Sequence, residues 1–182
     1  HPGPGYGGSC FPKDTLALAR TAREANAPMS LVEATIAAND ARKLAMAERV
    51  LNELGAAPRG KKVGVLGLAF KPETDDMRDA PSLTILPRLM EAGVTLSAFD
   101  PAAAQNAAGL LPTGIHYAAN ALEAMAGADL VLLLTEWNEF RALSPTKMRD
   151  AMRGAVAVDL RNAWDPVGMR EAGFRYVGVG RS

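Results

Sequence analysis

The sequence predicts an α/β protein in which a Rossmann-like doubly wound parallel sheet follows a helical segment. From residue 61 onward, short and almost wholly apolar runs alternate with helix-type segments, a pattern typical of a parallel sheet with both faces covered. Between a glycine-rich opening and residue 55 the pattern is helical. The 182 residues, of which 48% are hydrophobic, are enough to bury a core.

Two helices are expected in the first part of the chain. Pro12 and Asp14 indicate a helix over residues 12–26, because proline fits a first turn and an acidic side chain there favours the helix dipole. A second helix is predicted over residues 30–54, with Ser30 as its N-cap, Glu33 completing a capping box and Gly55 ending it. A helix of roughly 25 residues is longer than the average. We expect it to join domains or contact a second subunit, the alternative being an intramolecular core helix.

The remaining elements alternate as a parallel sheet requires. Strands are predicted at residues 63–68, 95–99, 130–134, 155–160 and 176–179, with helices at 82–91, 120–125, 145–152 and 166–172. A linker at residues 55–60 leads us to expect two domains, one over residues 1–57 and one over residues 58–182. His116 is expected in a loop, and Glu136 and Trp137 are expected to begin a structural helix or loop and not to belong to the site.

Composition excludes several classes of function. Twenty basic and 20 acidic residues balance, with no run of like charge, so neither nucleic acid nor a membrane surface is expected as a partner. No apolar run is long enough to span a bilayer, one cysteine cannot form an internal disulfide, and no metal site is predicted. A cytoplasmic location is expected. The abrupt glycine-rich opening at His1 leads us to expect a piece of a longer protein.

The most informative stretch is Gly-Pro-Gly-Tyr-Gly-Gly-Ser-Cys-Phe-Pro-Lys-Asp at residues 3–14. Glycines let a backbone approach a ligand closely, and Cys10 immediately precedes a predicted helix, whose N-terminus favours a thiolate. Lys13 adds positive charge, and Asp14 lies one turn away, close enough to position a water. These residues leave two alternatives open for Cys10, a nucleophile or a buried structural cysteine.

The run after the first strand does not form a standard dinucleotide site. Gly64 and Gly67 have the wrong spacing for G-x-G-x-x-G, and a long loop precedes the next helix. That loop still follows the carboxyl end of a strand, where open α/β sheets bind ligands. Lys71 and Arg78 would suit phosphates there, and the alternative is a solvated polar loop.

Several motifs together resemble one known family. The string at residues 3–14 resembles, nearly residue for residue, the active-site segment of the UDP-glucose/GDP-mannose dehydrogenase family. The runs at residues 67–72, 75–78 and 80–82 resemble the start of that family's UDP-binding domain. Residues 99–101, 135–137 and 159–162 are similar to later landmarks in the same order, so the resemblance covers essentially the whole chain.

The resemblance implies two successive oxidations of a nucleotide sugar at C6, with NAD⁺ as acceptor. Cys10 would carry the intermediate as a thiohemiacetal and then as a thioester, and Asp14 would help water to hydrolyse it. The run at residues 71–78 favours UDP-glucose over GDP-mannose or UDP-N-acetylmannosamine. A module that only binds UDP-sugar and dimerises is the remaining alternative.

The resemblance also implies roles for individual residues. The backbone from His1 to Gly7 would line the sugar and diphosphate, and residues 10–13 would border the nicotinamide. Phe70 and Lys71 would pack on and charge-pair with UDP, with Arg161 nearby, and Arg78 would reach the NAD. The substrate-binding set is therefore Gly3, Pro4, Gly5, Tyr6, Gly7, Phe70, Lys71 and Arg161, and the cofactor-binding set is Cys10, Lys13 and Arg78.

The resemblance further implies a homodimer formed through the helix at residues 30–54. The family's G-x-G-x-x-G domain has no counterpart in this sequence, nor do its catalytic lysine, asparagine, threonine and glutamate. NAD would therefore be bound mainly by a domain that this chain lacks, and the chain alone is expected to be inactive.

Overall fold

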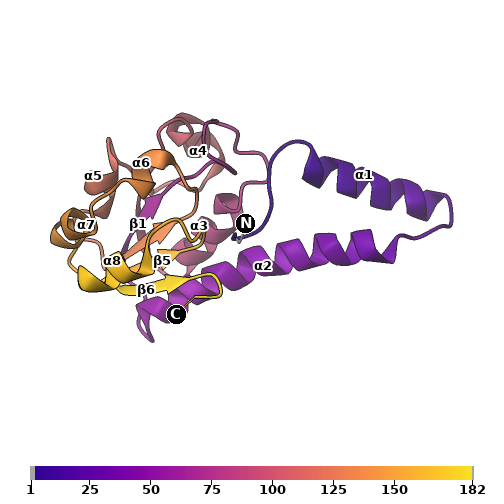
Figure 1. The fold of residues 1–182 in the computed structure, drawn as a ribbon. Helices are drawn as coiled ribbons and strands as arrows, with labels where there is room; N and C mark the ends of the chain where they lie inside the picture. Colours follow the sequence, from indigo (N-terminus) through magenta and orange to yellow (C-terminus); the bar gives the residue numbers. More distant parts are fainter. Residues whose placement is uncertain (1–2, 182) are drawn as a thin grey trace.

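The computed structural model describes residues 3–181 and contains a six-stranded parallel sheet with the order β3-β2-β1-β4-β5-β6 (Figure 1). The strands are β1 (Lys62–Leu66), β2 (Thr95–Phe99), β3 (His116–Tyr117), β4 (Leu130–Leu133), β5 (Val156–Asp159) and β6 (Arg175–Gly178). The helices are α1 (Phe11–Glu24), α2 (Ser30–Leu54), α3 (Ser82–Glu91), α4 (Ala104–Leu110), α5 (Ala121–Met125), α6 (Asn138–Arg141), α7 (Pro145–Ala151) and α8 (Pro166–Glu171). The predicted fold class is confirmed.

Both faces of the sheet are buried because the strands are apolar on both sides. In β4, Leu130 and Leu132 pack in the core shared with α2 and α3, whereas Val131 and Leu133 pack in the core shared with α5 and α7. Successive residues of a strand point to opposite faces, so a continuous apolar run fills two cores at once. This explains why the strand predictions at 95–99 and 130–134 agree so closely with the structure.

Three elements were not predicted, and one predicted role is wrong. The strand β3 is only two residues long, and His116 begins it instead of lying in a loop. The helices α4 and α6 were also not predicted. In α4 a single residue, Ala107, is buried, so its sequence shows almost no helical periodicity of apolar residues.

The predicted capping box at the start of α2 is also wrong. The helix begins at Ser30, but its N-cap is Met29, and no side chain caps it. The carboxylate of Glu33 instead accepts a 2.6 Å hydrogen bond from Arg23 Nε of α1. Glu33 therefore links the two helices and does not close its own first turn.

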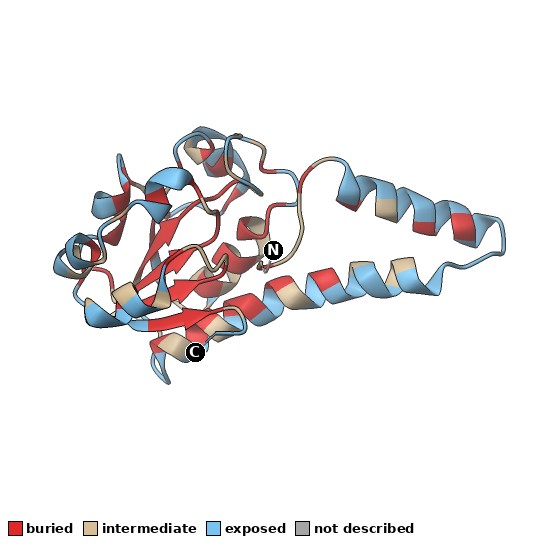
Figure 2. Cartoon of the chain, viewed as in Figure 1, coloured by how far each residue is buried: buried red, intermediate tan, exposed pale blue. Residues whose placement is uncertain are grey.

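The helices α1 and α2 form a hairpin that projects from the sheet (Figure 1). Figure 2 shows that the half of α2 nearer its C-terminus is buried against the sheet domain, through residues such as Ala47 and Val50, while the other half is largely exposed. The exposed large hydrophobic side chains of the hairpin and its connection are Phe11, Leu16, Leu18, Met29, Leu31 and Leu44.

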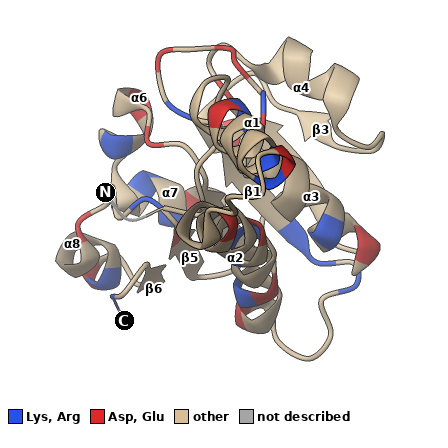
Figure 3. Ribbon diagram, turned by 90° about the vertical axis from the view of Figure 1, so that its right-hand side faces the viewer, with Lys and Arg blue, Asp and Glu red and all other residues tan. Residues whose placement is uncertain are grey.

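Basic and acidic residues are both spread over the helices and loops (Figure 3). Within residues 3–181, no helix combines the length and apolarity needed to cross a membrane. The same described residues contain no cluster of His, Cys, Asp and Glu that could hold a metal ion.

Candidate functional site

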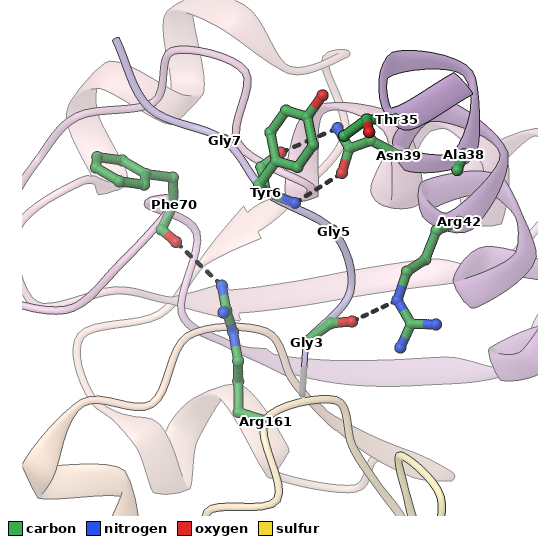
Figure 4. A pocket seen from close by; sticks show the side chains of 10 residues that line it. All are labelled: Gly3, Gly5, Tyr6, Gly7, Thr35, Ala38, Asn39, Arg42, Phe70 and Arg161. Atoms are coloured by element: carbon green, nitrogen blue, oxygen red, sulfur yellow. Dashed lines mark hydrogen bonds between the residues drawn. The ribbon is translucent and has the colours of Figure 1, made fainter. Parts of the chain in front are cut away.

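The glycine-rich segment runs between α2 and the loop that follows β1 (Figure 4). Tyr6 is held by Asn39 of α2: its N–H donates to Asn39 Oδ1 at 2.7 Å and its carbonyl accepts from Asn39 Nδ2 at 3.3 Å. Arg42 Nε donates to the Gly3 carbonyl at 2.7 Å. On the other side, the Gly8 N–H donates to the Arg78 carbonyl at 2.7 Å. The segment therefore links the hairpin to the sheet domain.

Glycine is required where the segment meets the loop after β1. Gly8 has a φ of +94°, and a β-carbon there would lie 2.7 Å from Phe70 Cε2. A β-carbon at Gly7 would collide with the Asp79 carbonyl oxygen. Side chains at these positions would force the glycine-rich segment away from the loop after β1.

A cavity of about 630 Å³ lies along this segment. It is lined by Gly3, Gly5, Tyr6, Gly7, Thr35, Ala38, Asn39, Arg42, Phe70 and Arg161 (Figure 4). Six of the expected substrate-binding residues thus come together, from positions far apart in the sequence. Phe70 follows β1 and Arg161 follows β5, so the cavity lies at the carboxyl ends of parallel strands, where such sheets bind ligands.

Two expected substrate residues do not line this cavity. Pro4 is buried, and Lys71 is exposed with its Nζ 5.4 Å from the centre of the Phe70 ring. His1 and Pro2, which were also expected along the sugar, lie outside the described residues. Conversely, sequence reasoning missed the side of the cavity formed by α2, which consists of Thr35, Ala38, Asn39 and Arg42.

Arg161 is held firmly in the cavity wall. Its Nε donates to the Leu134 carbonyl at 2.7 Å, its Nη2 donates to the Phe70 carbonyl at 3.0 Å, and its Nε lies 3.2 Å from Glu136 Oε2. Burial lowers the pKa of Arg161 below its ordinary value, and the charges of Glu136 and Asp159 oppose that shift. Glu136, expected to be structural, therefore compensates a buried charge.

Cys10 occupies the N-cap position of α1 and is exposed. The exposure contradicts the alternative of a buried structural cysteine. Pro12 and Asp14 both lie in the first turn, as predicted, and the Asp14 N–H donates to the Cys10 carbonyl at 2.8 Å. Lys13 Nζ lies 3.4 Å from Asp14 Oδ1, with both side chains exposed. The N-terminus of α1 therefore presents a thiol, a cation and a carboxylate together to solvent.

Arg78 lies beside a second cavity and is already paired. Its Nε and Nη2 donate to the two carboxylate oxygens of Asp76 at 2.9 and 2.8 Å. This hydrogen bonding raises the pKa of Arg78 and lowers the pKa of Asp76. The second cavity, of about 640 Å³, is lined by Asp75, Asp76, Met77, Arg78, Gln105, Asn106, Gly109 and Leu110. Neither Arg78 nor Cys10, Lys13 or Asp14 lines the first cavity.

The turn after β1 has its backbone donors occupied. In a dinucleotide site these N–H groups would face a pyrophosphate. Here the N–H groups of Leu68 and Ala69 donate to Asp100 Oδ2 at 2.7 and 3.1 Å. This geometry agrees with the expectation that the sheet lacks a standard dinucleotide turn.

Comparison with known proteins identifies the family. Residues 64–166 match the UDP binding domain of the UDP-glucose/GDP-mannose dehydrogenase family, and residues 1–41 match its central domain. UDP-glucose 6-dehydrogenase of Rhizobium meliloti (strain 1021) is 48% identical over 181 residues, which cover 100% of this chain and 41% of that protein. UDP-glucose 6-dehydrogenase TuaD of Bacillus subtilis (strain 168) is 38% identical, covering 98% of this chain and 39% of its own length.

Solved structures agree with these sequence matches. A UDP-glucose dehydrogenase from Pyrobaculum islandicum superimposes with a TM-score of 0.84 at 33% identity, covering 99% of this chain and 39% of that chain. An NDP-N-acetyl-D-galactosaminuronic acid dehydrogenase from Methanosarcina mazei Go1 gives a TM-score of 0.85 at 27% identity, covering 100% of this chain and 40% of its own. The chain thus spans about two-fifths of the length of the relatives that it matches. It belongs to the UDP-glucose/GDP-mannose dehydrogenase family and carries that family's UDP binding domain together with part of its central domain.

Proposed function

We propose that this chain is the UDP-sugar-binding and cysteine-bearing part of an NAD-dependent UDP-glucose 6-dehydrogenase. The observation that supports this most is the cavity in which the glycine-rich segment meets Phe70 and Arg161 at the carboxyl ends of β1 and β5. The 48% identity to the Rhizobium meliloti enzyme favours UDP-glucose as the substrate.

In this proposal the nucleotide sugar lies along the first cavity. The diphosphate follows the backbone from Gly3 to Gly7, the uridine packs near Phe70, and the exposed ammonium of Lys71 adds positive charge at the cavity mouth. A diphosphate carries negative charge that backbone N–H groups and a lysine can neutralise.

Cys10 performs the covalent step. Its thiolate adds to the C6 aldehyde, which the first oxidation has formed, and gives a thiohemiacetal. Loss of a second hydride converts this to a thioester, and water then releases the carboxylate and the thiol. Asp14 orients that water and accepts its proton, because its carboxylate follows Cys10 by one helical turn.

NAD⁺ would accept the hydride in each oxidation, and this chain would contribute only the edge of its site. Cys10, Lys13 and Arg78 are all exposed and would border it. The turn after β1 does not suit the pyrophosphate, since Asp100 already occupies the N–H groups of Leu68 and Ala69. The chain alone is therefore proposed to bind NAD⁺ hardly at all and to be inactive.

The proposal divides the chain into residues 1–57, which carry the cysteine and the dimerisation helices, and residues 58–182, which bind UDP. Dimerisation through α2 would cover exposed apolar side chains such as Leu31 and Leu44. A dehydrogenase for another nucleotide sugar is the second candidate, because the Methanosarcina mazei enzyme shares the fold as fully as the UDP-glucose enzyme does.

Calorimetric titration of the chain with UDP-glucose, GDP-mannose and NAD⁺ tests the proposal. We expect weak binding of UDP-glucose, weaker binding of GDP-mannose and almost none of NAD⁺. Lys71→Ala should weaken UDP-glucose binding at low salt, and added salt should narrow the difference from the parent, since screening reduces an exposed charge contact. Tight NAD⁺ binding, or a preference for GDP-mannose, would contradict the assignment.

A further inference from the structure

Two arginines line the first cavity, and they differ in how far their guanidinium groups are already occupied. Arg161 approaches Gly3 from the loop after β5, and Arg42 approaches it from α2 (Figure 4). The Nε and Nη2 atoms of Arg161 donate to two carbonyls, and Glu136 compensates its charge. Arg42 donates only through Nε, to the Gly3 carbonyl. Within residues 3–181, its two terminal nitrogens have no acceptor and its charge has no carboxylate partner.

The charge of the cavity follows from this difference. The ten lining residues of the described chain include two arginines and no carboxylate. Because Glu136 pairs with Arg161 at 3.2 Å, the uncompensated positive charge among the lining residues is that of Arg42. A half-buried guanidinium with free terminal nitrogens can donate two parallel hydrogen bonds to two oxygens of one anion, such as a phosphate or a carboxylate.

The backbone beside Arg42 offers further donors. Gly5 and Gly7 line the same cavity, and among residues 3–181 their N–H groups donate to no acceptor. Arg42, Asn39 and Thr35 follow one another at helical spacing on one face of α2, and all three line the cavity. Asn39 fixes Tyr6, and the Nε of Arg42 fixes Gly3, so the arginine is held in place while its terminal nitrogens stay available.

We infer that Arg42 contacts the diphosphate of the nucleotide sugar and supplies most of the salt-sensitive part of its affinity. This inference rests on the proposed function and adds to it a ligand contact from α2. Arg161 then acts as a positioning residue, which holds Phe70 and the loop after β4 in place.

Titration of Arg42→Gln with UDP, compared with the parent chain at several salt concentrations, tests this contact. We expect the affinity for UDP to fall by about tenfold or more at low salt, because a charge-assisted hydrogen bond is lost. The affinity of Arg42→Gln for UDP should also change less with salt concentration than that of the parent. Arg42→Lys keeps the positive charge but loses the paired guanidinium donors, so its affinity for UDP should lie between that of the parent and that of Arg42→Gln. Inorganic pyrophosphate should compete with UDP for the parent chain and much less for Arg42→Gln.

Arg20→Gln is the matched control, because it removes the same charge from an exposed position on α1 where Arg20 pairs with Glu24. It should bind UDP as the parent does. Thermal unfolding of each variant shows whether the fold is retained. If folded Arg42→Gln matched the parent in affinity and salt dependence, the Arg42 contact would be wrong while UDP binding stood. If the folded parent bound no UDP, the proposed function would fail and the contact with it.

Discussion

The sheet and the helical hairpin differ in how completely they bury their apolar side chains. All four residues of β4, Leu130–Leu133, are fully buried, with 0% exposure. On the hairpin, Leu31 is 83% exposed, Phe11 55% and Leu16 54%. Helices of this chain, including the C-terminal half of α2, cover both faces of the sheet, whereas the outer half of the hairpin leaves large apolar side chains exposed. Stability should therefore depend mainly on the sheet, and the candidate site lies where the hairpin joins it.

The largest expected effect is on the free energy of unfolding. Leu132→Ala leaves a cavity in the centre of the sheet and should cost about 2–5 kcal/mol. Leu31→Ala removes an exposed side chain of the same type and should change the stability of the monomer by less than about 0.5 kcal/mol. Urea unfolding at low protein concentration measures both. Similar losses in the two variants would remove the distinction between the regions.

The second prediction concerns self-association through the hairpin. We expect a dimer, and Leu31→Ser should weaken it by about tenfold or more, because burying a leucine contributes about 1.5–3 kcal/mol. Leu110→Ser is the control, since Leu110 is 61% exposed but lies on α4 in the sheet domain. Light scattering over a range of concentrations gives the result. A strictly monomeric parent at high concentration would refute dimerisation through α2.

The third prediction concerns the glycine-rich segment, which links the hairpin to the sheet domain. Asn39→Ala deprives the Tyr6 N–H and carbonyl of their partners, a loss of about 1–3 kcal/mol. The loss should be local, so hydrogen exchange at the Tyr6 amide should accelerate while the amides of β4 keep their protection. Asn52→Ala, at an exposed position of the same helix, should leave both unchanged. Equal acceleration in β4 would mean that the segment and the sheet open together.

Sequence reasoning succeeded where one local pattern decides the structure. For this reason the sequence predicts the strands at residues 95–99 and 130–134 correctly. It also predicts correctly that Pro12 and Asp14 lie in the first turn of a helix. It failed where a distant partner decides. Glu33 pairs with Arg23 of the neighbouring helix and not with its own first turn.

The site was predicted only in part for the same reason. Arg42 reaches Gly3 across 39 residues of sequence, so no local motif marks it as part of the cavity. The family resemblance predicted Phe70 and Arg161 as site residues. It could not show that two carbonyls and Glu136 already hold the guanidinium of Arg161.

The smallest expected effect is electrostatic and belongs to the sheet domain. Hydrogen bonds from Arg153 lower the pKa of Asp129, which lies 2.6 Å from Arg153 Nη2. A carboxylate whose pKa is lowered by folding stabilises the protein above its unfolded pKa, about 3.9, and this contribution is lost as the pH falls through the folded value. Arg153→Gln should therefore destabilise the protein only slightly at pH 7, because an exposed ion pair is screened by solvent, and the difference from the parent should shrink under acid conditions. Urea unfolding at pH 7 and pH 3 measures the difference in stability between the variant and the parent. A difference that is larger at pH 3 than at pH 7 would contradict the prediction.

The central claim is that Cys10 at the start of the hairpin carries the acyl group, and intact-protein mass spectrometry tests it most directly. In the full-length enzyme proposed above, Asp14→Asn should slow thioester hydrolysis by about 10²–10⁴-fold. Mixing that variant with UDP-glucose and excess NAD⁺ should then add the mass of one acylated sugar nucleotide. The added mass should be absent when Cys10→Ala is combined with it, and Cys10→Ala alone should form no carboxylate. Carboxylate formation at the parental rate by Cys10→Ala, or normal turnover without an adduct in Asp14→Asn, would contradict the account.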